Sequence, residues 1–229
     1  MPAITIREFL AQTADAQRNE GMFELETPHM LQINMKGLMW IKLGSMIAYR
    51  GDISFEREGM LERGVGQLLK RTISGEGAKL TKAQGTGALY LADKGKRVTL
   101  LKLEGESIVV NGNDLLAFEA SIKNEITMMR KVSAIASGGL FNVRLSGSGI
   151  IAITTHHKPV TLVVRAGQPI HTDPQATVAW SGHLTPDFKT DIQFKTLLGR
   201  GSGESFQMHF DGDGFVIVQP YEEDLLQSD

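Results

Sequence analysis

Cysteine is absent from this chain of 229 residues. Its absence excludes disulfide bonds, thiolate metal sites and a cysteine nucleophile. Long apolar runs are absent too, since runs such as residues 149–153 and 215–218 are far shorter than the ~20 residues that span a bilayer. The first residues show no basic region followed by an apolar core, so we expect neither a secretory signal nor a transit peptide. Together these features predict a cytoplasmic protein.

Motifs that would indicate catalysis or a bound cofactor are incomplete. Residues 199–203 resemble a phosphate-binding loop, but Glu204 stands where the dinucleotide fingerprint needs a third glycine, and no helical pattern follows. A turn between strands is the favoured interpretation of this segment. We therefore predict that the protein is not an enzyme and has no cofactor.

The six histidines form no His-x-His motif, which a cupin-type metal site needs. His156 and His157 are adjacent and would point to opposite faces of a strand. A metal site would require single histidines, such as His171 and His183, to converge from different strands. We expect no metal site, and a metal-dependent, cupin-like enzyme is the weakest of our hypotheses.

An internal repeat is the most informative feature that the sequence does contain. A shift of 62 residues places Gly85 on Gly147, Gly87 on Gly149 and Ala117 on Ala179 without a gap. Over residues 75–122 the shift gives eight identities, against roughly three or four expected by chance from average residue usage. A repeat of this length indicates a fold built from similar units.

A third copy is predicted to be split between the two ends of the chain. Residues 48–53 match residues 117–122 and 179–184, whereas residues 212–218 match the Gly-x-Gly motifs and the apolar runs that follow them. We therefore expect the C-terminal strands to complete the unit that the N-terminal strands begin. That arrangement would close a pseudo-threefold body.

The local pattern favours strands almost throughout. Residues 23–26 and 31–36 alternate apolar and polar side chains, and Gly37 separates the second run from a further strand over residues 38–43. From Lys79 onward, strands follow one another every eight to twelve residues with turn residues between them. The predicted organisation is an N-terminal extension with a short helix ended by Gly21 (residues 1–21), one three-repeat β domain (residues 22–220) and an acidic tail (residues 221–229).

Charge is distributed unevenly along the chain. The net charge of −2 argues against general nucleic-acid binding, but nine lysines and arginines lie between Arg63 and Lys102, against Glu76 and Asp93. Solvated positions on a β surface are the simpler interpretation of this run. The candidate interaction surface consists of Arg63, Lys70, Arg71, Lys94, Lys96, Arg97 and Arg200.

Several segments together resemble one known family. They are residues 44–51, the glycine-rich segment before Lys70 and Arg71, and residues 74–76, 203–206 and 214–220. In this order they resemble the altered-inheritance-of-mitochondria family, also called the mitochondrial biogenesis family, over roughly residues 22–220. The resemblance implies a fold similar to the tryptophan RNA-binding attenuator protein, a short double-stranded β-helix, repeated three times in one chain. It implies no catalytic residues, and it does not imply RNA binding, because a fold does not fix a function.

We expect an all-β, non-enzymatic scaffold or protein-interaction module that acts as a homo-oligomer, because unpaired strand edges must be covered. The expected contact segments are residues 59–71, residues 199–203 and the basic turn around Lys94. The protein partner is unidentified, and a membrane surface is a further candidate. The alternative function is a small-ligand or nucleic-acid binding module that uses the basic face or the pseudo-threefold axis.

Overall fold

The structure, a computed structural model, describes residues 3–15, 20–57, 80–128, 141–190 and 206–222. Within these residues the chain forms strands β1 to β14 and one short helix, α1, which confirms the all-β prediction. The predicted contact segments 59–71 and 199–203, and all but the first two residues of the acidic tail, lie outside the described residues.

The first unit of the fold contains β1 (Phe23–Thr27), β2 (Met30–Lys42), β3 (Met46–Arg57) and β4 (Leu80–Leu91). All pairs in this unit are antiparallel: β2 lies between β4 and β1, and β3 pairs with the other side of β4. Strand β4 therefore lies between β2 and β3 in the sheet.

The second unit repeats this arrangement with β5 (Arg97–Asn111), β6 (Leu115–Glu119), β7 (Lys123–Met128) and β8 (Phe141–Thr155). Strand β8 pairs with β5 along most of its length, and it pairs with β6 and β7 on its other side. Strands β6 and β7 together take the place that β3 has in the first unit.

The third unit has the same plan in shorter pieces. Strand β14 pairs with β9 and β11, while β13 pairs with β10 and β12 in a separate three-stranded sheet. Its strands are β9 (Val160–Val164), β10 (Ile170–Thr172), β11 (Thr177–Ser181), β12 (Asp187–Thr190), β13 (Phe206–Phe210) and β14 (Gly214–Val218).

The prediction of a third copy split between the chain ends is therefore wrong. The C-terminal strands complete the unit that β9 begins, and the N-terminal strands form a complete unit of their own with β4. The three units follow one another in tandem. The match of residues 212–218 to the Gly-x-Gly motifs did not reveal which strands they pair with, and their partners β9 and β11 are nearer in the sequence than the N-terminal strands.

A β-bulge recurs at the same place in all three units. A bulge adds one residue to one strand and bends it, so the bend itself is repeated. The register shifts between Met46 and Ala48 in β3, between Leu115 and Ala117 in β6, and between Thr177 and Ala179 in β11.

Glycines inside the long strands allow close approach of backbones. A Cβ atom at Gly85 or Gly87 would lie 1.9 Å from a carbonyl oxygen of β3, and both residues have positive φ angles. Gly37 has φ of 110° but lies within β2, which is continuous from Met30 to Lys42. The predicted break between two strands at Gly37 is therefore wrong, since glycine adopts this angle without ending the ladder.

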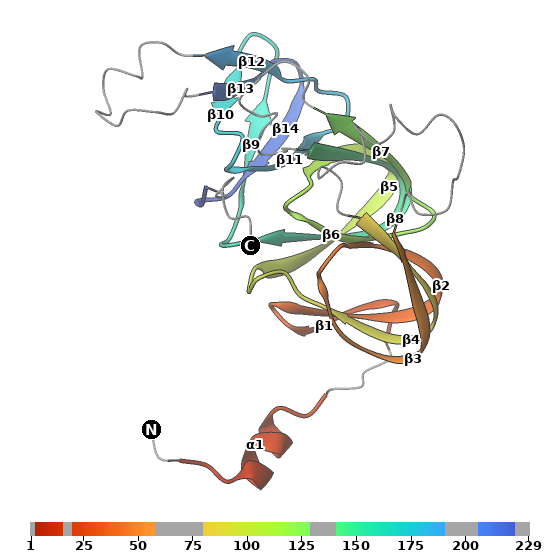
Figure 1. The fold of residues 1–229 in the computed structure, drawn as a ribbon. Coiled ribbons are helices and arrows are strands. Elements are labelled where there is room, and N and C mark those ends of the chain that lie inside the picture. The colour runs from red at the N-terminus through yellow and green to blue at the C-terminus, as the bar shows by residue number, and fades with distance from the viewer. Residues whose placement is uncertain (1–2, 16–19, 58–79, 129–140, 191–205, 223–229) are drawn as a thin grey trace.

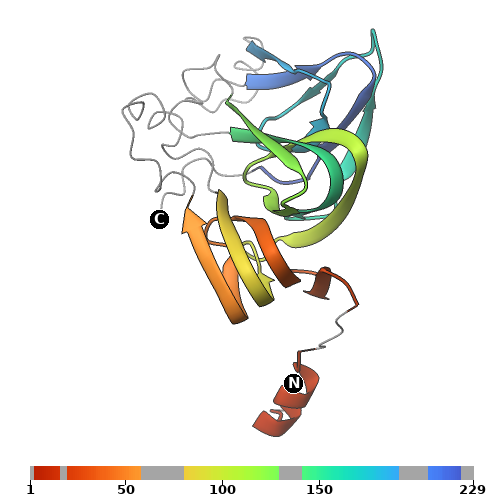
Figure 2. The same cartoon turned by 90° about the vertical axis from the view of Figure 1, so that its right-hand side faces the viewer.

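The units are joined in series by short strand pairs. Strand β2 of the first unit pairs with β6 of the second, and β5 of the second pairs with β11 of the third. Figures 1 and 2 show the three units following one another, with β1–β4 at one end and β9–β14 at the other. The path of the largest sheet begins at β3 and ends at β9, and no pair of described strands joins the third unit back to the first. The closure that a pseudo-threefold body requires is thus not seen among the described strands.

The buried core is continuous across these joints. One apolar cluster centres on the second unit but includes Trp40 from β2 and Val178 from β11. A second cluster fills the first unit and takes in Val98, Leu116 and Ala152 from the second. A third cluster fills the last unit around Phe210. Burial on both sides of each joint favours a single cooperative body.

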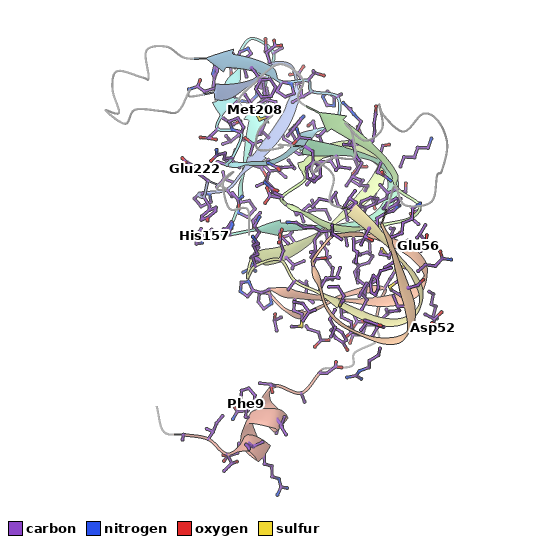
Figure 3. All side chains as sticks on the ribbon, in the orientation of Figure 1. Phe9, Asp52, Glu56, His157, Met208 and Glu222 are labelled. Carbon is purple, nitrogen blue, oxygen red and sulfur yellow. The ribbon has the colours of Figure 1, made fainter. Side chains whose placement is uncertain are left out.

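The N-terminal helix α1 (Ile6–Gln12) begins with a capping box between Thr5 and Glu8. None of its residues is buried, and Figure 3 shows Phe9 on the helix well away from the strands. The helix ends at Gln12, well before Gly21, so the predicted helix end was wrong. No helix among the described residues is long and apolar enough to cross a membrane.

Candidate functional site

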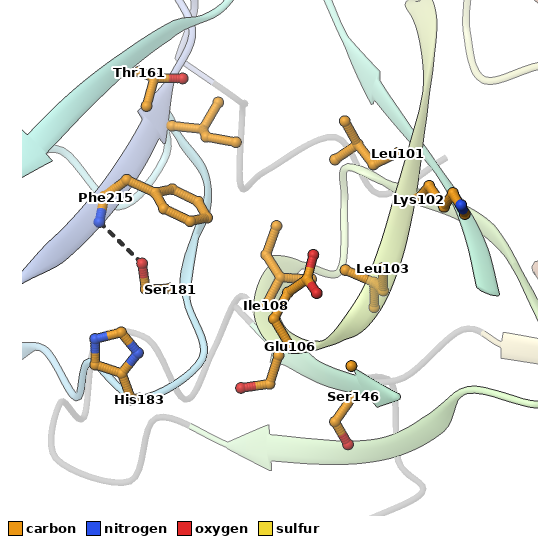
Figure 4. A pocket seen from close by; sticks show the side chains of 13 residues that line it. Leu101, Lys102, Leu103, Glu106, Ile108, Ser146, Thr161, Ser181, His183 and Phe215 are labelled. Atoms are coloured by element: carbon orange, nitrogen blue, oxygen red, sulfur yellow. Dashed lines mark hydrogen bonds between the residues drawn. The ribbon is translucent and has the colours of Figure 1, made fainter. Parts of the chain in front are cut away.

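A groove lies where the second unit meets the third. It has a volume of about 850 Å³ and is lined by β5, β8, β9, β11 and β14. Its apolar lining comes from Leu101, Leu103 and Ile108 on β5, which face Phe215 on β14 (Figure 4). Ile217 on β14 also lines the groove. The groove lies beside the short pair of β5 with β11, which joins the second unit to the third within one large sheet.

Polar side chains are placed around this apolar lining. The hydroxyl oxygen of Ser181 accepts a hydrogen bond from the backbone N–H of Phe215, at 2.9 Å. Nε2 of His183 lies 2.6 Å from the backbone carbonyl oxygen of Asp213, which fixes the imidazole at the rim. Glu106 accepts a hydrogen bond from the backbone N–H of Glu104. Apolar walls with a few fixed polar groups are typical of sites that bind small molecules.

A network of buried charges lies at the joint between the first two units. Nζ of Lys96 lies 3.0 Å from Oδ1 of Asp114, and the side chains are 3% and 0% exposed. Nζ of Lys42 lies 2.8 Å from Oδ2 of Asp93, which also accepts a hydrogen bond from the Thr154 hydroxyl at 2.9 Å. The charges are paired and hydrogen-bonded, which is the condition under which buried ions are tolerated. This network therefore holds two units together.

The predicted basic surface is only partly described. Lys94 and Arg97 are exposed, and the positive φ of Lys94 agrees with the predicted turn. Lys96 was wrongly placed in this surface, because its ammonium group points inward to Asp114. The other members of the candidate interaction surface, Arg63, Lys70, Arg71 and Arg200, lie outside the described residues.

Two histidines do converge from different strands. Nδ1 of His209 on β13 lies 2.9 Å from Nε2 of His171 on β10. A metal site needs at least a third ligand, and no group of three or more histidine, aspartate or glutamate side chains suited to a metal ion occurs among the described residues.

Strand β3 exposes side chains at repeat positions that are buried in the other two units. Met46, Ile47 and Tyr49 are 42%, 57% and 47% exposed. The apolar character of these residues did not predict their exposure, because apolar residues at the same positions of β6 and β11 are buried. A signal was nevertheless present, because the terminal units of a repeat lack one neighbour and expose what the inner units bury.

A polar contact attaches the N-terminal segment to the first unit. Oδ2 of Asp15 lies 3.2 Å from Nη2 of Arg50 and accepts a hydrogen bond from the Tyr90 hydroxyl at 2.9 Å. Burial, followed by the hydrogen bond to Asp15 and the charge of that carboxylate, raises the pKa of Tyr90. The contact places the segment beside the exposed strand β3.

Comparison with known proteins identifies the family. The model of the family described as mitochondrial biogenesis AIM24 matches residues 23–221. The chain belongs to the AIM24 family. This confirms the resemblance found in the sequence, whereas the proposed likeness to the tryptophan RNA-binding attenuator protein stays a prediction.

A solved structure has a similar fold. The crystal structure of protein SPYM3_0169 from Streptococcus pyogenes superposes with a TM-score of 0.67, at 21% sequence identity over 87% of this chain and 92% of that one. At this identity the likeness concerns the fold alone. A search of curated proteins gives no match.

Proposed function

We propose that this AIM24-family protein is a non-enzymatic scaffold that binds protein partners through the open edge of its strand arrangement. The observation that supports the proposal is the exposed apolar row Met46, Ile47 and Tyr49 on β3, which pairs only with β4 among the described strands. Soluble proteins usually cover or charge such edges, because an open edge accepts another strand. A partner that adds a strand would gain backbone hydrogen bonds and cover these side chains.

The test is a comparison of binding by the parent protein and an Ile47→Lys variant. Each is immobilised, and proteins retained from an extract of the source cells are quantified. Ile47 is exposed, so the variant should keep the parent melting temperature while losing the retained partners. Equal retention by both proteins would contradict a role for this edge. Asp52→Lys, another exposed position on β3, serves as the control for added charge.

The second candidate function is small-ligand binding in the groove between the second and third units. Its volume of about 850 Å³ falls within the range usual for ligand sites. Native mass spectrometry of the purified protein tests this candidate: a bound mass that disappears in a Leu101→Trp variant would favour it, because the indole fills the groove. No bound mass, and no thermal shift with a metabolite collection, would argue against it. We keep the cytoplasm as the proposed location, because the chain has no cysteine with which to form the disulfides common in secreted proteins.

A further inference from the structure

Three strands occupy equivalent positions in the three units. Tyr49 on β3 pairs with Leu89 on β4, and Phe118 on β6 pairs with Ile151 on β8. Trp180 on β11 pairs in the same way with Val216 on β14. Each of these aromatic residues directly follows the repeated bulge. Tyr49, Phe118 and Trp180 are therefore structural equivalents.

Strands β6 and β11 are each paired with a strand of the preceding unit, and the two pairs have the same register. Trp40 on β2 lies opposite Phe118, and Val109 on β5 lies opposite Trp180. Phe118 and Trp180 are consequently 0% and 4% exposed, whereas Tyr49 is 47% exposed. The pattern extends along the strand, because Leu116 and Val178 are fully buried and their equivalent Ile47 is exposed.

The other half of such a joint is present at the far end of the molecule. Trp40 and Val109 are equivalent to His171 on β10, since Trp40 pairs with Lys82, Val109 with Arg144 and His171 with His209. Strand β10 is at the edge of its three-stranded sheet, and among the described strands it pairs only with β13. His171 is exposed, whereas its equivalents Trp40 and Val109 are buried.

We propose that a second copy of this chain docks head to tail, with β10 of one copy pairing antiparallel with residues 48–50 of β3 in the next. The two internal joints fix the register: Thr172 opposite Ala48, His171 opposite Tyr49 and Ile170 opposite Arg50. This inference rests on the proposed function, since it names the partner of the open edge. One interface of this kind is heterologous, so it closes into a ring or continues as a filament according to the rotation between copies.

A second copy suits this edge better than an unrelated strand. The chain already forms this pairing twice within itself, with the same bulge and the same register on each occasion. Docking would cover Met46, Ile47 and Tyr49 at one end and give β10 a second neighbouring strand at the other. A single contact would thus use two strands that each end a sheet among the described strands.

The test uses engineered cysteines, which are specific because the chain has none of its own. Tyr49→Cys and His171→Cys are purified separately, mixed and oxidised. Residues directly opposite in an antiparallel pair have Cα atoms about 4.5–5.5 Å apart, which suits a disulfide. We expect a disulfide-linked dimer in the mixture, and at least ten times less from either variant alone.

The matched control replaces His171→Cys by His209→Cys. His209 is partly exposed and lies beside His171, but on β13, one strand further from the docking partner. A second strand spacing of about 4.8 Å puts its Cα beyond the ~7 Å limit for a disulfide. Equal yields with His209→Cys, or no linked dimer in the mixture, would overturn the proposal. A disulfide that forms within one chain of a Tyr49→Cys/His171→Cys double variant would also overturn it.

Light scattering separates this inference from the function on which it rests. The parent protein should have the mass of an oligomer, and Tyr49→Lys should reduce it to that of one chain. If the parent is monomeric at every soluble concentration but Ile47→Lys still loses other protein partners, self-pairing fails and the scaffold function stands. If neither self-pairing nor partner loss is found, both fail.

Discussion

Two joints connect the three units, one between the first and second units and one between the second and third. The strand pairing is the same in both joints, but the side chains differ. In both, three residues of one strand pair with three of the next unit in an identical register. The first joint stacks Trp40 on Phe118, with ring centroids 6.0 Å apart, and Nζ of Lys82 lies 4.9 Å from the Trp40 ring centroid. The second leaves the groove open beside it.

The two joints also differ in their charged groups, since the first contains buried ion pairs. Lys42, which binds Asp93 in the first joint, corresponds to Asn111 in the second, and the amide of Asn111 donates to the carbonyl of Thr177. The buried Lys96 corresponds to the exposed Lys158. A lysine is thus buried only where carboxylates are available to pair with it. The repeated strand pairing positions the units, whereas the side chains fill the first joint and leave a candidate binding groove at the second.

The largest expected effect is at the aromatic stack of the first joint. Phe118→Ala removes a fully buried ring from the core, and we expect the free energy of unfolding to fall by about 3–5 kcal/mol. Urea denaturation followed by circular dichroism measures this. The equivalent, exposed Tyr49→Ala should change monomer stability far less, so similar losses at the two positions would break the comparison between covered and open strands.

A somewhat smaller loss is expected in the charged network. Asp114→Ala leaves the Lys96 ammonium buried without its nearest carboxylate, and we expect a loss of about 3 kcal/mol in urea denaturation. Part should be recovered in an Asp114→Ala/Lys96→Met double variant, because no unpaired charge is then buried. Glu104→Ala is the control: it breaks the exposed pair with Lys102 and should cost less than about 1 kcal/mol. An equal cost for Asp114→Ala and Glu104→Ala would contradict the assigned role of the network.

A methyl group at the second joint should have a moderate effect. The backbone N–H of Gly182 donates to the Ser107 carbonyl, and its carbonyl accepts from the Arg144 guanidinium. An added Cβ would lie 2.0 Å from the Ser107 hydroxyl oxygen and 2.7 Å from its carbonyl carbon. We expect Gly182→Ala to cost about 1–3 kcal/mol by overpacking. The first joint already has Ala120 at the equivalent position, so Ala120→Gly is the matched control and should cost little. A neutral Gly182→Ala would show that the second joint is looser than described.

Much of this architecture could be predicted from the sequence, because alternation and repeat spacing are local signals. The 62-residue shift placed β4 on β8 and β6 on β11 correctly. Strands β8 and β14 align at 65 residues, and the match of residues 212–214 with residues 147–149 had this spacing. The assignment of β14 to the N-terminal unit was wrong, because β14 pairs with β9 and β11. The burial of Lys96 was missed because Asp114 approaches it only after folding. The exposure of β3 was missed because its apolar residues resemble those of β6 and β11 in type, and residue type does not show whether a neighbouring unit covers the strand.

The smallest expected effect lies outside both joints, where Asp15 contacts Tyr90. The pKa of Tyr90 is raised above its ordinary value of 10.0, chiefly by burial and then by Asp15, so the neutral hydroxyl is favoured in the folded state. Any stability that this provides is fully present below pH 10 and is lost as the pH rises through the raised pKa. Ultraviolet titration of a Tyr49→Phe/Tyr221→Phe background, which leaves Tyr90 as the single tyrosine, should show a lower pKa after Asp15→Asn. If the pKa does not move, the Asp15 carboxylate does not accept the hydrogen bond of the Tyr90 hydroxyl in solution, and the placement of the N-terminal segment beside β3 is contradicted.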